Sequence, residues 1–364
     1  MKRWFVAIGL LLGSSASIVH AAPVPPAPSR AAIDAQLQAN AATHGIPAQA
    51  VLVMHNAELV YRGTTGTTSL GDGKPVTSRT VFPIYSVSKL FTNTLVHQLA
   101  EEGKIDLAAP ASRYVPELPP AWRAITIEQF LNHQSGVPDF FDPKDLSRPF
   151  PPTLRAVFET LGQQPMLFDT GMKTRYTGTN YLVLEAVLEA VTHKPYRQLL
   201  TERIIEPLHL RHTWLDEAKV PKGDIVASYH AEGGKPVPDA PVAWPDYAIA
   251  QGCIYASLDD VATFVSAVAN GRFVSKPGWL RYWQPNTQGD GVMGGFESGW
   301  DFGQSEGGWH EVGHDGGTKV RVRILYRDNL DDHYVVVYLT NGNGDDVWSR
   351  TLLDSVQALV VPGT

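Results

Sequence analysis

The sequence predicts an α+β fold, in which helices flank an antiparallel sheet built from both chain ends and a mainly helical lobe is inserted over roughly 104–245. Strand-like runs occur near the N-terminus and again in the last quarter of the chain. Segments with a 3.6-residue apolar period separate them. One sheet assembled from both ends, with helices covering its apolar faces, satisfies this order of elements. No linker-like stretch or repeat divides 29–364, so we expect a single domain there.

The N-terminal part begins with a helix and a hairpin. Ser29 can cap a helix that runs to about residue 44, because its hydroxyl can accept a hydrogen bond from the first helical turn. Two apolar runs follow, at 50–54 and 58–62, and the Asn56-Ala57 pair between them is typical of a turn. These runs are therefore expected to pair as neighbouring strands.

Helix signals dominate the middle of the chain. Thr126 with Gln129 has the spacing of a capping box ahead of a short helix. The segment 179–192 carries an apolar face with helical period. Ser257 can start a further helix, which we expect to end at Gly271.

The last part of the chain returns to strands and closes with a helix. Gly- and Trp-rich turns separate the runs 320–326 and 334–339, which we expect to be strands. A helix from about 345 to 362 should follow, with Trp348 and Leu352 on its apolar face. These are the elements that would join the N-terminal hairpin in one sheet.

Composition and charge narrow the partners. The chain has 364 residues with 43% hydrophobic and 18% charged content, so it can bury a large core. Its net charge of −7 and the absence of a long basic run argue against nucleic acid or anionic membrane as the main partner. We therefore expect a small-molecule or peptidoglycan-type substrate. Cys253 is the single cysteine, so no internal disulfide can form.

The first 22 residues are typical of an export signal. Lys2 and Arg3 precede an apolar run from Trp4 to Leu12, and small residues lead to Ala21. The run is too short for a stable membrane anchor. We expect cleavage there, a Pro-rich tether at 23–28, no membrane anchor after cleavage, and a periplasmic or secreted protein. The sequence leaves the oligomeric state open.

Ser86 and Lys89 are the first chemical signal. The stretch 82–92 places them three residues apart at the start of a helical stripe that stops at Gly103. Side chains at i and i+3 lie on the same side of a helix, so the amine can reach the hydroxyl. A nearby amine can activate serine as a nucleophile. The helix N-terminus favours the negative charge that develops.

Three further stretches, in order and spacing, complete a resemblance. With 82–92, the segments 126–138, 176–181 and 313–318 resemble the serine β-lactamase and D-Ala-D-Ala carboxypeptidase superfamily, in its class C, esterase-like branch. The resemblance covers nearly all of the chain after the export signal. It implies the β-lactamase/transpeptidase-like fold and a covalent acyl-enzyme that forms without a metal or cofactor.

The resemblance also implies the catalytic roles. Ser86 would be the nucleophile, and Lys89 with Tyr176 would move the proton. A phenol held near an ammonium would have a lowered pKa, so a Tyr176 phenolate beside Lys89 is the expected base.

The fourth stretch corresponds to the family's substrate-binding strand. His314, Asp315 and Gly316 would border the substrate, and His314 would hydrogen-bond near the Ser86 and Tyr176 oxygens. Glycines there let a substrate carbonyl approach the backbone. The N–H groups of Ser86 and Gly317 would then form an oxyanion hole.

One position departs from the family pattern. An Asn usually stands two residues after the Tyr, where it helps to bind the substrate amide and to orient the lysine, but here the residue is Gly178. Asn180 could compensate, although a structural role at a helix start fits it better. The departure favours an ester or small amide over a β-lactam or peptide. It also keeps open a penicillin-binding-like protein that binds or regulates without turnover.

A second motif overlaps the fourth stretch. His310-Glu311-Val312-Gly313-His314 matches the zinc-peptidase pattern His-Glu-x-x-His, which requires a helix. The crowding glycines disfavour a helix, and in a strand the two histidines would lie about 13 Å apart. A zinc peptidase is therefore the remote alternative to a serine hydrolase.

Overall fold

The computed structural model describes residues 29–71, 73–142, 149–305 and 307–364. The predicted export signal at 1–22 and the tether at 23–28 lie outside these residues. Among the described helices, none is both long enough and apolar enough to span a bilayer.

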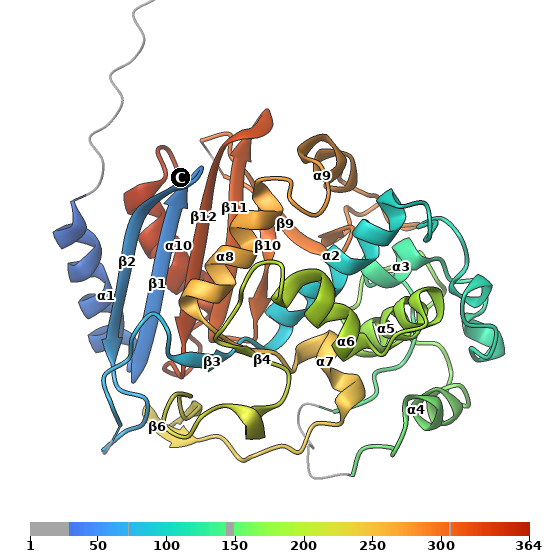
Figure 1. Ribbon diagram of the computed structural model, residues 1–364, viewed down its shortest axis with the longest axis horizontal. Coiled ribbons are helices and arrows are strands. Elements are labelled where there is room, and N and C mark those ends of the chain that lie inside the picture. The colour runs from blue at the N-terminus through green and yellow to red at the C-terminus, as the bar shows by residue number, and fades with distance from the viewer. Residues whose placement is uncertain (1–28, 72, 143–148, 306) are drawn as a thin grey trace, which may run out of the picture.

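A seven-stranded antiparallel sheet forms one half of the molecule (Figure 1), in the order β2-β1-β12-β11-β10-β9-β8. Its two N-terminal strands thus pair with strands from the C-terminal part of the chain. The strands are β1 Ala48–His55, β2 Glu58–Gly66, β8 Phe296–Glu297, β9 Trp300–Gln304, β10 His310–Gly316, β11 Val320–Arg327 and β12 Asn329–Thr340. The α+β fold with a sheet from both chain ends is confirmed.

Small sheets connect this half to the rest. The first holds β3 Val81–Pro83, β7 Tyr255–Ser257 and β4 Thr213–Trp214, and the second holds β5 Tyr229–Glu232 and β6 Lys235–Pro238. β3 leads into the short 3-10 helix η1, Tyr85–Val87, which continues as α2, Ser88–Glu101.

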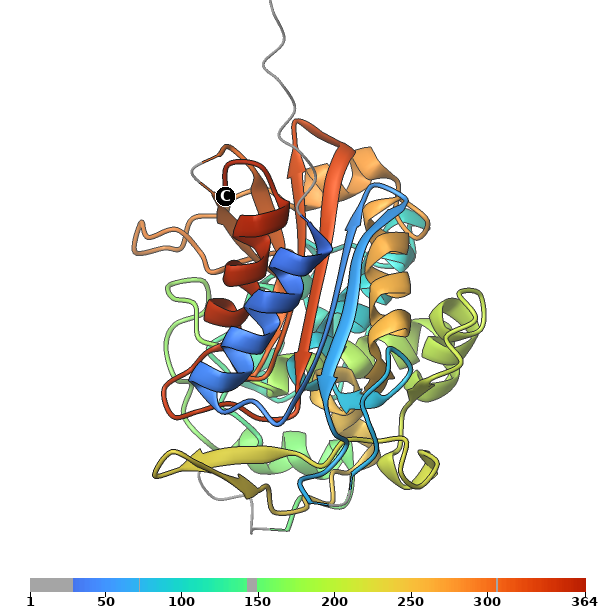
Figure 2. The same cartoon turned by 90° about the vertical axis from the view of Figure 1, so that its left-hand side faces the viewer.

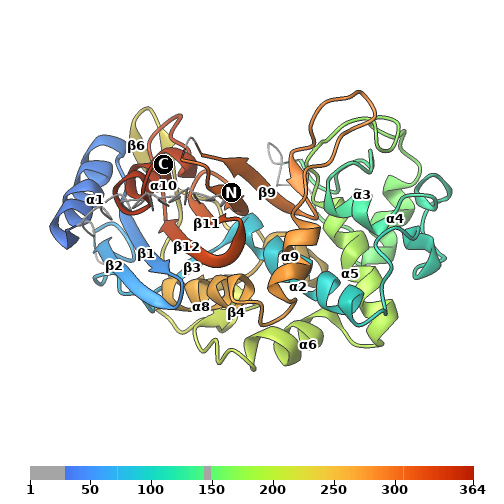
Figure 3. The ribbon, with the colours of Figure 1, turned by 90° about the horizontal axis from the view of Figure 1, so that it is seen from above.

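Helices cover both faces of the large sheet. Helices α1 Arg30–His44 and α10 Ser349–Val360 lie side by side on one face (Figure 2), and α8 Leu258–Ala269 lies on the other. The helical lobe lies beside the sheet, beyond α2 (Figure 3). Its helices are α3 Ile127–Leu131, α4 Leu154–Leu161, α5 Thr179–Thr192 and α6 Tyr196–Leu200, and α7 Ile249–Gly252 and α9 Lys276–Tyr282 come later in the chain.

Short helical turns complete the described elements. These are η2 Ala111–Arg113, η3 Pro120–Trp122, the π-helical turn η4 Thr201–Ile205, η5 Glu217–Lys219 and η6 Asp246–Ala248.

Alternate side chains of β12 belong to different hydrophobic cores, one on each face of the large sheet. Val335 and Val337 belong to the larger core, which extends under α8 and through the helical lobe. Val336 and Tyr338 belong to a second core under α1 and α10. Because successive side chains on a strand point to opposite faces, one apolar run serves both cores.

The predicted caps form as expected. Ser29 accepts a hydrogen bond from Ala32 N, and Thr126 with Gln129 makes the full capping box. Ser257 accepts from Asp260 N at the start of α8. Each pairs a backbone N–H that the helix start leaves free.

The last helix differs from its prediction. It begins at Ser349, four residues later than expected at the earliest, and Trp348 is 58% exposed instead of lying on the buried face. Asp346 has a φ of 58°, so the chain turns there and cannot continue as a helix from that point.

Candidate active site

Ser86 lies in η1, at the turn between β3 and α2. The preceding residue, Tyr85, has a φ of 46°, a left-handed conformation that costs a non-glycine residue free energy. Its side chain is fixed by a hydrogen bond between its hydroxyl and Ser228 Oγ at 2.9 Å. Ser86 itself is only partly buried, whereas the residues 87–90 that follow it are buried.

Tyr176 meets Ser86 from the loop before α5. Its hydroxyl donates to Ser86 Oγ at 2.6 Å. The Tyr176 ring packs near His133, Phe296 and His314, with ring centroids 4.5, 6.0 and 5.8 Å away. Because 41% of Tyr176 stays exposed, the pair is open to solvent and to a substrate.

Lys89 is fully buried beneath this pair. Its Nζ donates to Gln251 O at 2.5 Å, with Gln251 Oε1 at 3.5 Å, and lies 4.8 Å from the Tyr176 ring centroid. Burial lowers the Lys89 pKa to about 7. The amine can therefore lose its proton near neutral pH, and the unprotonated form is the one that can accept a proton.

The direct contact expected from the i, i+3 spacing does not form. Among the residues that the structure describes, Lys89 Nζ hydrogen-bonds to Gln251 and not to Ser86. Ser86 belongs to the 3-10 turn and Lys89 to the α-helix after it, and the Lys89 amine reaches Gln251 of α7 instead. The ring of Tyr176 lies close to both groups.

The expected Tyr176 phenolate is wrong for the free site. Although Tyr176 is 41% exposed, the protein around it desolvates the phenol and raises its pKa, and the hydrogen bond to Ser86 offsets this only in part. The phenol stays protonated and donates to Ser86 Oγ. Of the two groups, Lys89 is thus the one poised to act as base near neutral pH.

His314 lies on β10 with its ring toward this centre, 4% exposed. Its Nδ1 lies 2.8 Å from Asp315 O, so Nδ1 carries the proton and donates to that carbonyl. Burial, aided by Lys89, lowers the His314 pKa to about 4, and the ring is neutral. Nε2, a buried acceptor, has no partner among the described residues. The expected hydrogen bond to the Ser86 or Tyr176 oxygen is not made.

Asp315 does not face the site, contrary to its expected place at the substrate. Its carboxylate accepts from Arg321 Nη1 at 2.6 and 2.8 Å and from Arg323 Nη2 at 3.1 Å. Arg321 in turn lies 4.0 Å from Asp354 of α10, which covers the opposite face of the sheet. Strand alternation sends neighbouring side chains to opposite faces, so only the backbone of Asp315 can border a substrate.

Gly316 and Gly317 bring the end of β10 against the Ser86 turn. A Cβ at Gly316 would lie 2.6 Å from Ile84 O, so only glycine permits this approach. Gly317 has a φ of 57°. Its N–H donates to none of the acceptors among the described residues, which leaves it available to a developing oxyanion.

Aromatic side chains and an amide fill the place of the missing Asn. A Cβ at Gly178 would lie 2.8 Å from Phe140 Cε1, 3.2 Å from Phe141 Cε1 and 3.3 Å from Gln251 Oε1. The Gly178 N–H donates to Asp139 Oδ1 at 3.0 Å. Gln251, which sequence reasoning missed, is 5% exposed and supplies from α7 the amide that contacts Lys89.

Asn180 and His133 support the site from behind. Asn180 Oδ1 accepts from Ser135 Oγ at 2.5 Å, and its Nδ2 lies 2.8 Å from His133 Nδ1. Thr177 N also donates to His133 Nδ1, at 3.2 Å. Asn180 thus has the expected structural role, and the His133 ring forms a platform under Tyr176.

The zinc-peptidase motif lies in a strand. His310–Gly316 is β10, with His310 exposed and His314 buried. Among the residues that the structure describes, no group of three or more His, Cys, Asp or Glu side chains could hold a metal ion. The helical geometry that this motif needs is not present.

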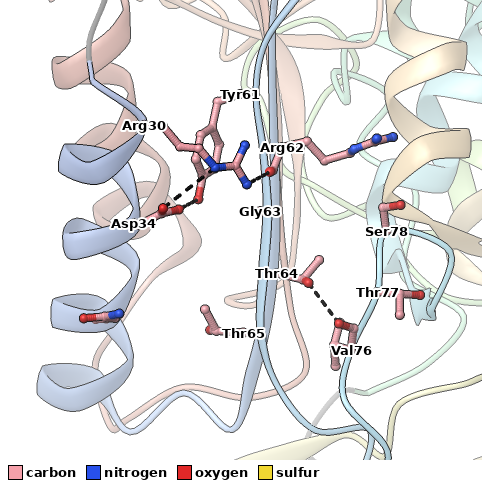
Figure 4. Close-up of a pocket in the computed structure, with 11 residues that line it drawn as sticks. Arg30, Asp34, Tyr61, Arg62, Gly63, Thr64, Thr65, Val76, Thr77 and Ser78 are labelled. Carbon is pink, nitrogen blue, oxygen red and sulfur yellow. Dashed lines mark hydrogen bonds and ion pairs between the residues drawn. The ribbon is translucent and has the colours of Figure 1, made fainter.

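A cavity of about 520 Å³ lies apart from this centre, between α1, β2 and the segment 76–78 (Figure 4). Asp34, Tyr61 and Arg62 line it, and none of the predicted site residues does. The Tyr61 hydroxyl donates to Asp34 Oδ1 at 2.6 Å, so these two lining groups are paired with each other.

Comparison with known proteins gives one consistent family. Residues 33–357 match the Beta-lactamase family. The putative penicillin-binding protein PbpX of Bacillus subtilis is 26% identical over 247 residues, which are 67% of this chain and 60% of PbpX. The chain spans about 40–60% of the length of the curated relatives it matches.

Solved structures share the fold over nearly the whole chain. A D-stereospecific amidohydrolase from Streptomyces sp. has a TM-score of 0.71 at 23% identity, covering 93% of this chain and 100% of that one. EstCE1, described as a hydrolase with promiscuous acyltransferase activity, has a TM-score of 0.71 at 20% identity, with 91% and 99% covered. The resemblance read from the four sequence stretches is confirmed.

Proposed function

The chain belongs to the Beta-lactamase family, and we propose that it is an exported serine hydrolase in which Ser86 takes up an acyl group from an ester or small amide. The observation that carries this proposal is the hydrogen bond of 2.6 Å between Tyr176 and Ser86 Oγ, beside a buried lysine whose pKa is about 7. A serine is activated when its proton has a path to a base.

The proton moves from Ser86 toward Lys89. As Ser86 Oγ bonds to the substrate carbonyl carbon, the Tyr176 hydroxyl turns from Ser86 toward the unprotonated Lys89 amine. The Ser86 proton then passes to the Tyr176 oxygen while the Tyr176 proton passes to Lys89. The carbonyl oxygen takes the electron pair of the broken π bond, and the N–H groups of Ser86 and Gly317 stabilise it.

The acyl-enzyme then forms and breaks down. The bond from carbon to the leaving group breaks, and the leaving group takes the proton back from Lys89 through Tyr176. In the second half water attacks the acyl carbon and gives up one proton to Lys89 through Tyr176. The bond from the acyl carbon to Ser86 Oγ then breaks, and Oγ takes that proton back by the same path.

Electrostatics around His314 favour a substrate without a carboxylate beside the scissile bond. His314 is neutral with a pKa of about 4, so it offers an acceptor and no positive charge. Arg321 and Arg323 are held by Asp315 on the opposite face of β10. Neutral esters and amides, and not the carboxylates of β-lactams or peptidoglycan stem peptides, suit this site. The amidohydrolase and the hydrolase EstCE1 among the relatives support this choice.

An activity-based probe tests the proposal. A labelled fluorophosphonate should modify Ser86, and Ser86→Ala should abolish both this labelling and the hydrolysis of p-nitrophenyl esters. The rates on a small panel would assign the substrate: esters and amino-acid amides should exceed a chromogenic cephalosporin and a D-Ala-D-Ala peptide. Failure of the probe on folded protein, with a related enzyme labelled alongside, would refute the hydrolase.

A non-catalytic binding protein is the second candidate, because Gly178 stands where the family has Asn and PbpX is a putative penicillin-binding protein. Pre-steady-state kinetics separate the two. A stoichiometric burst followed by turnover supports the hydrolase, whereas a stable acyl adduct without turnover, or no burst, supports the binder.

A further inference from the structure

Glu297 is a buried carboxylate without a protein partner. It is 3% exposed, and its side chain makes no hydrogen bond or ion pair with any of the described residues. Burial raises the Glu297 pKa to about 7. Carboxylates are rarely buried unless they are paired, because removing the charge from water is costly. A buried carboxylate that remains unpaired suggests a ligand that completes it.

Glu297 lines a cavity of about 480 Å³, a volume common for small-molecule sites. Trp283 and Tyr326 form its apolar wall, 2% and 5% exposed, with ring centroids 5.7 Å apart. Val312 and Phe302 complete that wall. The cavity thus combines one unpaired charged group with aromatic surfaces.

The other ionisable residues of the lining add mainly negative charge. Glu311 and Asp328 are carboxylates, and Glu311 Oε1 accepts from Gln357 Nε2 at 2.9 Å. No lysine or arginine is among the described lining residues, and His310, stacked on Tyr326 at 5.3 Å, is the one side chain there that can become positive. This balance attracts cations and repels anions.

The Glu297 side chain points away from the Ser86 centre. Phe296 and Glu297 are consecutive on β8, and the Phe296 ring packs toward Tyr176 and His314. Neighbouring side chains on a strand point to opposite faces, so Glu297 points away from that centre. None of the proposed catalytic residues lines the cavity.

We propose that this cavity, which we call the Glu297 pocket, binds a small organic cation whose ammonium or guanidinium group pairs with Glu297 while its apolar part packs against Trp283 and Tyr326. A carboxylate supplies a charge-assisted contact, and aromatic faces attract a cation directly. A metal ion does not fit, since the described residues offer no set of three His, Cys, Asp or Glu side chains that could hold one.

Binding of benzyltrimethylammonium to the folded protein, followed by isothermal titration and by Trp283 fluorescence, tests the proposal. Benzyl alcohol and benzoate are the neutral and anionic controls. Glu297→Gln, which keeps the shape of the side chain, should weaken binding of the cation about tenfold or more. Glu232→Gln on β5, an exposed glutamate elsewhere, is the matched control and should bind as wild type does.

The pH dependence provides a second arm. Affinity for the cation should rise from pH 6 to pH 8, because Glu297 loses its proton over that interval. His310 is the one histidine of the lining, so His310→Gln should retain the rise if Glu297 causes it.

Two results would overturn the proposal. One is equal affinity of wild type and Glu297→Gln, measured on variants that a fluorophosphonate still labels at the wild-type rate, which reports an intact fold. The other is equal affinity of the wild type for benzyl alcohol and the cation. Unchanged binding by Ser86→Ala is expected, and its loss would instead place the cation at the Ser86 centre.

Discussion

The Tyr176 hydroxyl donates a hydrogen bond of 2.6 Å to Ser86 Oγ across 90 positions of sequence. Ser86 belongs to the turn that follows β3, and Tyr176 to the loop before α5 in the helical lobe. The contact therefore joins the sheet half of the molecule to the lobe, and the proposed chemistry requires both halves to keep their places.

Lys89 should set the acidic limb of the pH profile. Its pKa is lowered to about 7 by burial, so the amine is protonated and unable to accept a proton below that pH. We expect kcat/KM for a p-nitrophenyl ester to rise with pH through about 7. Lys89→Arg, which stays protonated, should lose about 100-fold or more. This acidic limb should persist in Glu297→Gln, which removes the carboxyl whose pKa is also about 7. Activity of Lys89→Arg within tenfold of wild type would contradict the role of Lys89 as base.

The side chain at position 251 should influence the pKa of Lys89. Replacing it by Glu adds a carboxylate about where the Oε1 atom lies, 3.5 Å from Lys89 Nζ, and an opposite charge stabilises the ammonium. We expect the acidic limb for Gln251→Glu to move to higher pH while KM changes little. A profile that coincides with that of wild type would show that Gln251 only fills space.

Gly178→Asn, which restores the family residue, should destabilise the protein. The new Cβ would lie 2.8 Å from Phe140 Cε1, and overpacking of this kind costs about 1–3 kcal/mol. Thermal unfolding checks the loss. Gly178→Asn combined with Phe140→Leu should recover part of it, whereas an unchanged Tm in the single variant would refute the steric account.

Gly316→Ala should reduce activity more than it reduces stability. Its Cβ would approach Ile84 O to 2.6 Å, which pushes β10 away from the Ser86 turn and displaces the oxyanion N–H groups. Gly303→Ala on β9 is the matched control, since its nearest contact would be an ordinary 3.9 Å. Ester hydrolysis should fall at least about tenfold in the first variant and stay near wild type in the second. Equal rates would indicate that the approach of β10 has no catalytic role.

Asp315 should matter for stability at low pH. Burial alone would raise the Asp315 pKa, but the guanidiniums of Arg323 and Arg321 together lower it. A carboxyl whose folded pKa lies below its unfolded value of about 3.9 stabilises the fold above that pH and loses the contribution as pH falls. Asp315→Asn should therefore cost about 3 kcal/mol at pH 7, since it leaves buried guanidiniums underpaired, and much less near pH 3. Denaturant titrations at both pH values would measure it, and equal losses would contradict the electrostatic origin.

Local signals account for what the sequence could predict. The caps at Ser29, Thr126 and Ser257 depend on residues three positions apart, and β12 alternates between two cores over its own length. The face of the sheet to which the Asp315 side chain points could not be predicted from such local signals, because it depends on contacts with Arg321 and Arg323 of the neighbouring strand. Gln251 lies 162 positions from Lys89, and no pattern connects the two.

The sequence predicts Tyr176 and not Lys89 as the base for a similar reason. Proximity to an ammonium predicts a lowered phenol pKa, but burial is the larger effect at both groups and acts in opposite directions on them. It raises the pKa of Tyr176 and lowers that of Lys89. Only the three-dimensional packing around the two side chains reveals how strongly the protein desolvates each of them.

The central claim is that Ser86, activated through Tyr176, carries the acyl group. Mass spectrometry of the chain quenched within milliseconds of mixing with p-nitrophenyl acetate tests it most directly. We predict one added acetyl group on the peptide that contains Ser86, formed about 100-fold or more slowly in Tyr176→Phe and absent in Ser86→Ala. Ester hydrolysis at the wild-type rate by Ser86→Ala, or an acetyl group on another residue, would contradict the account.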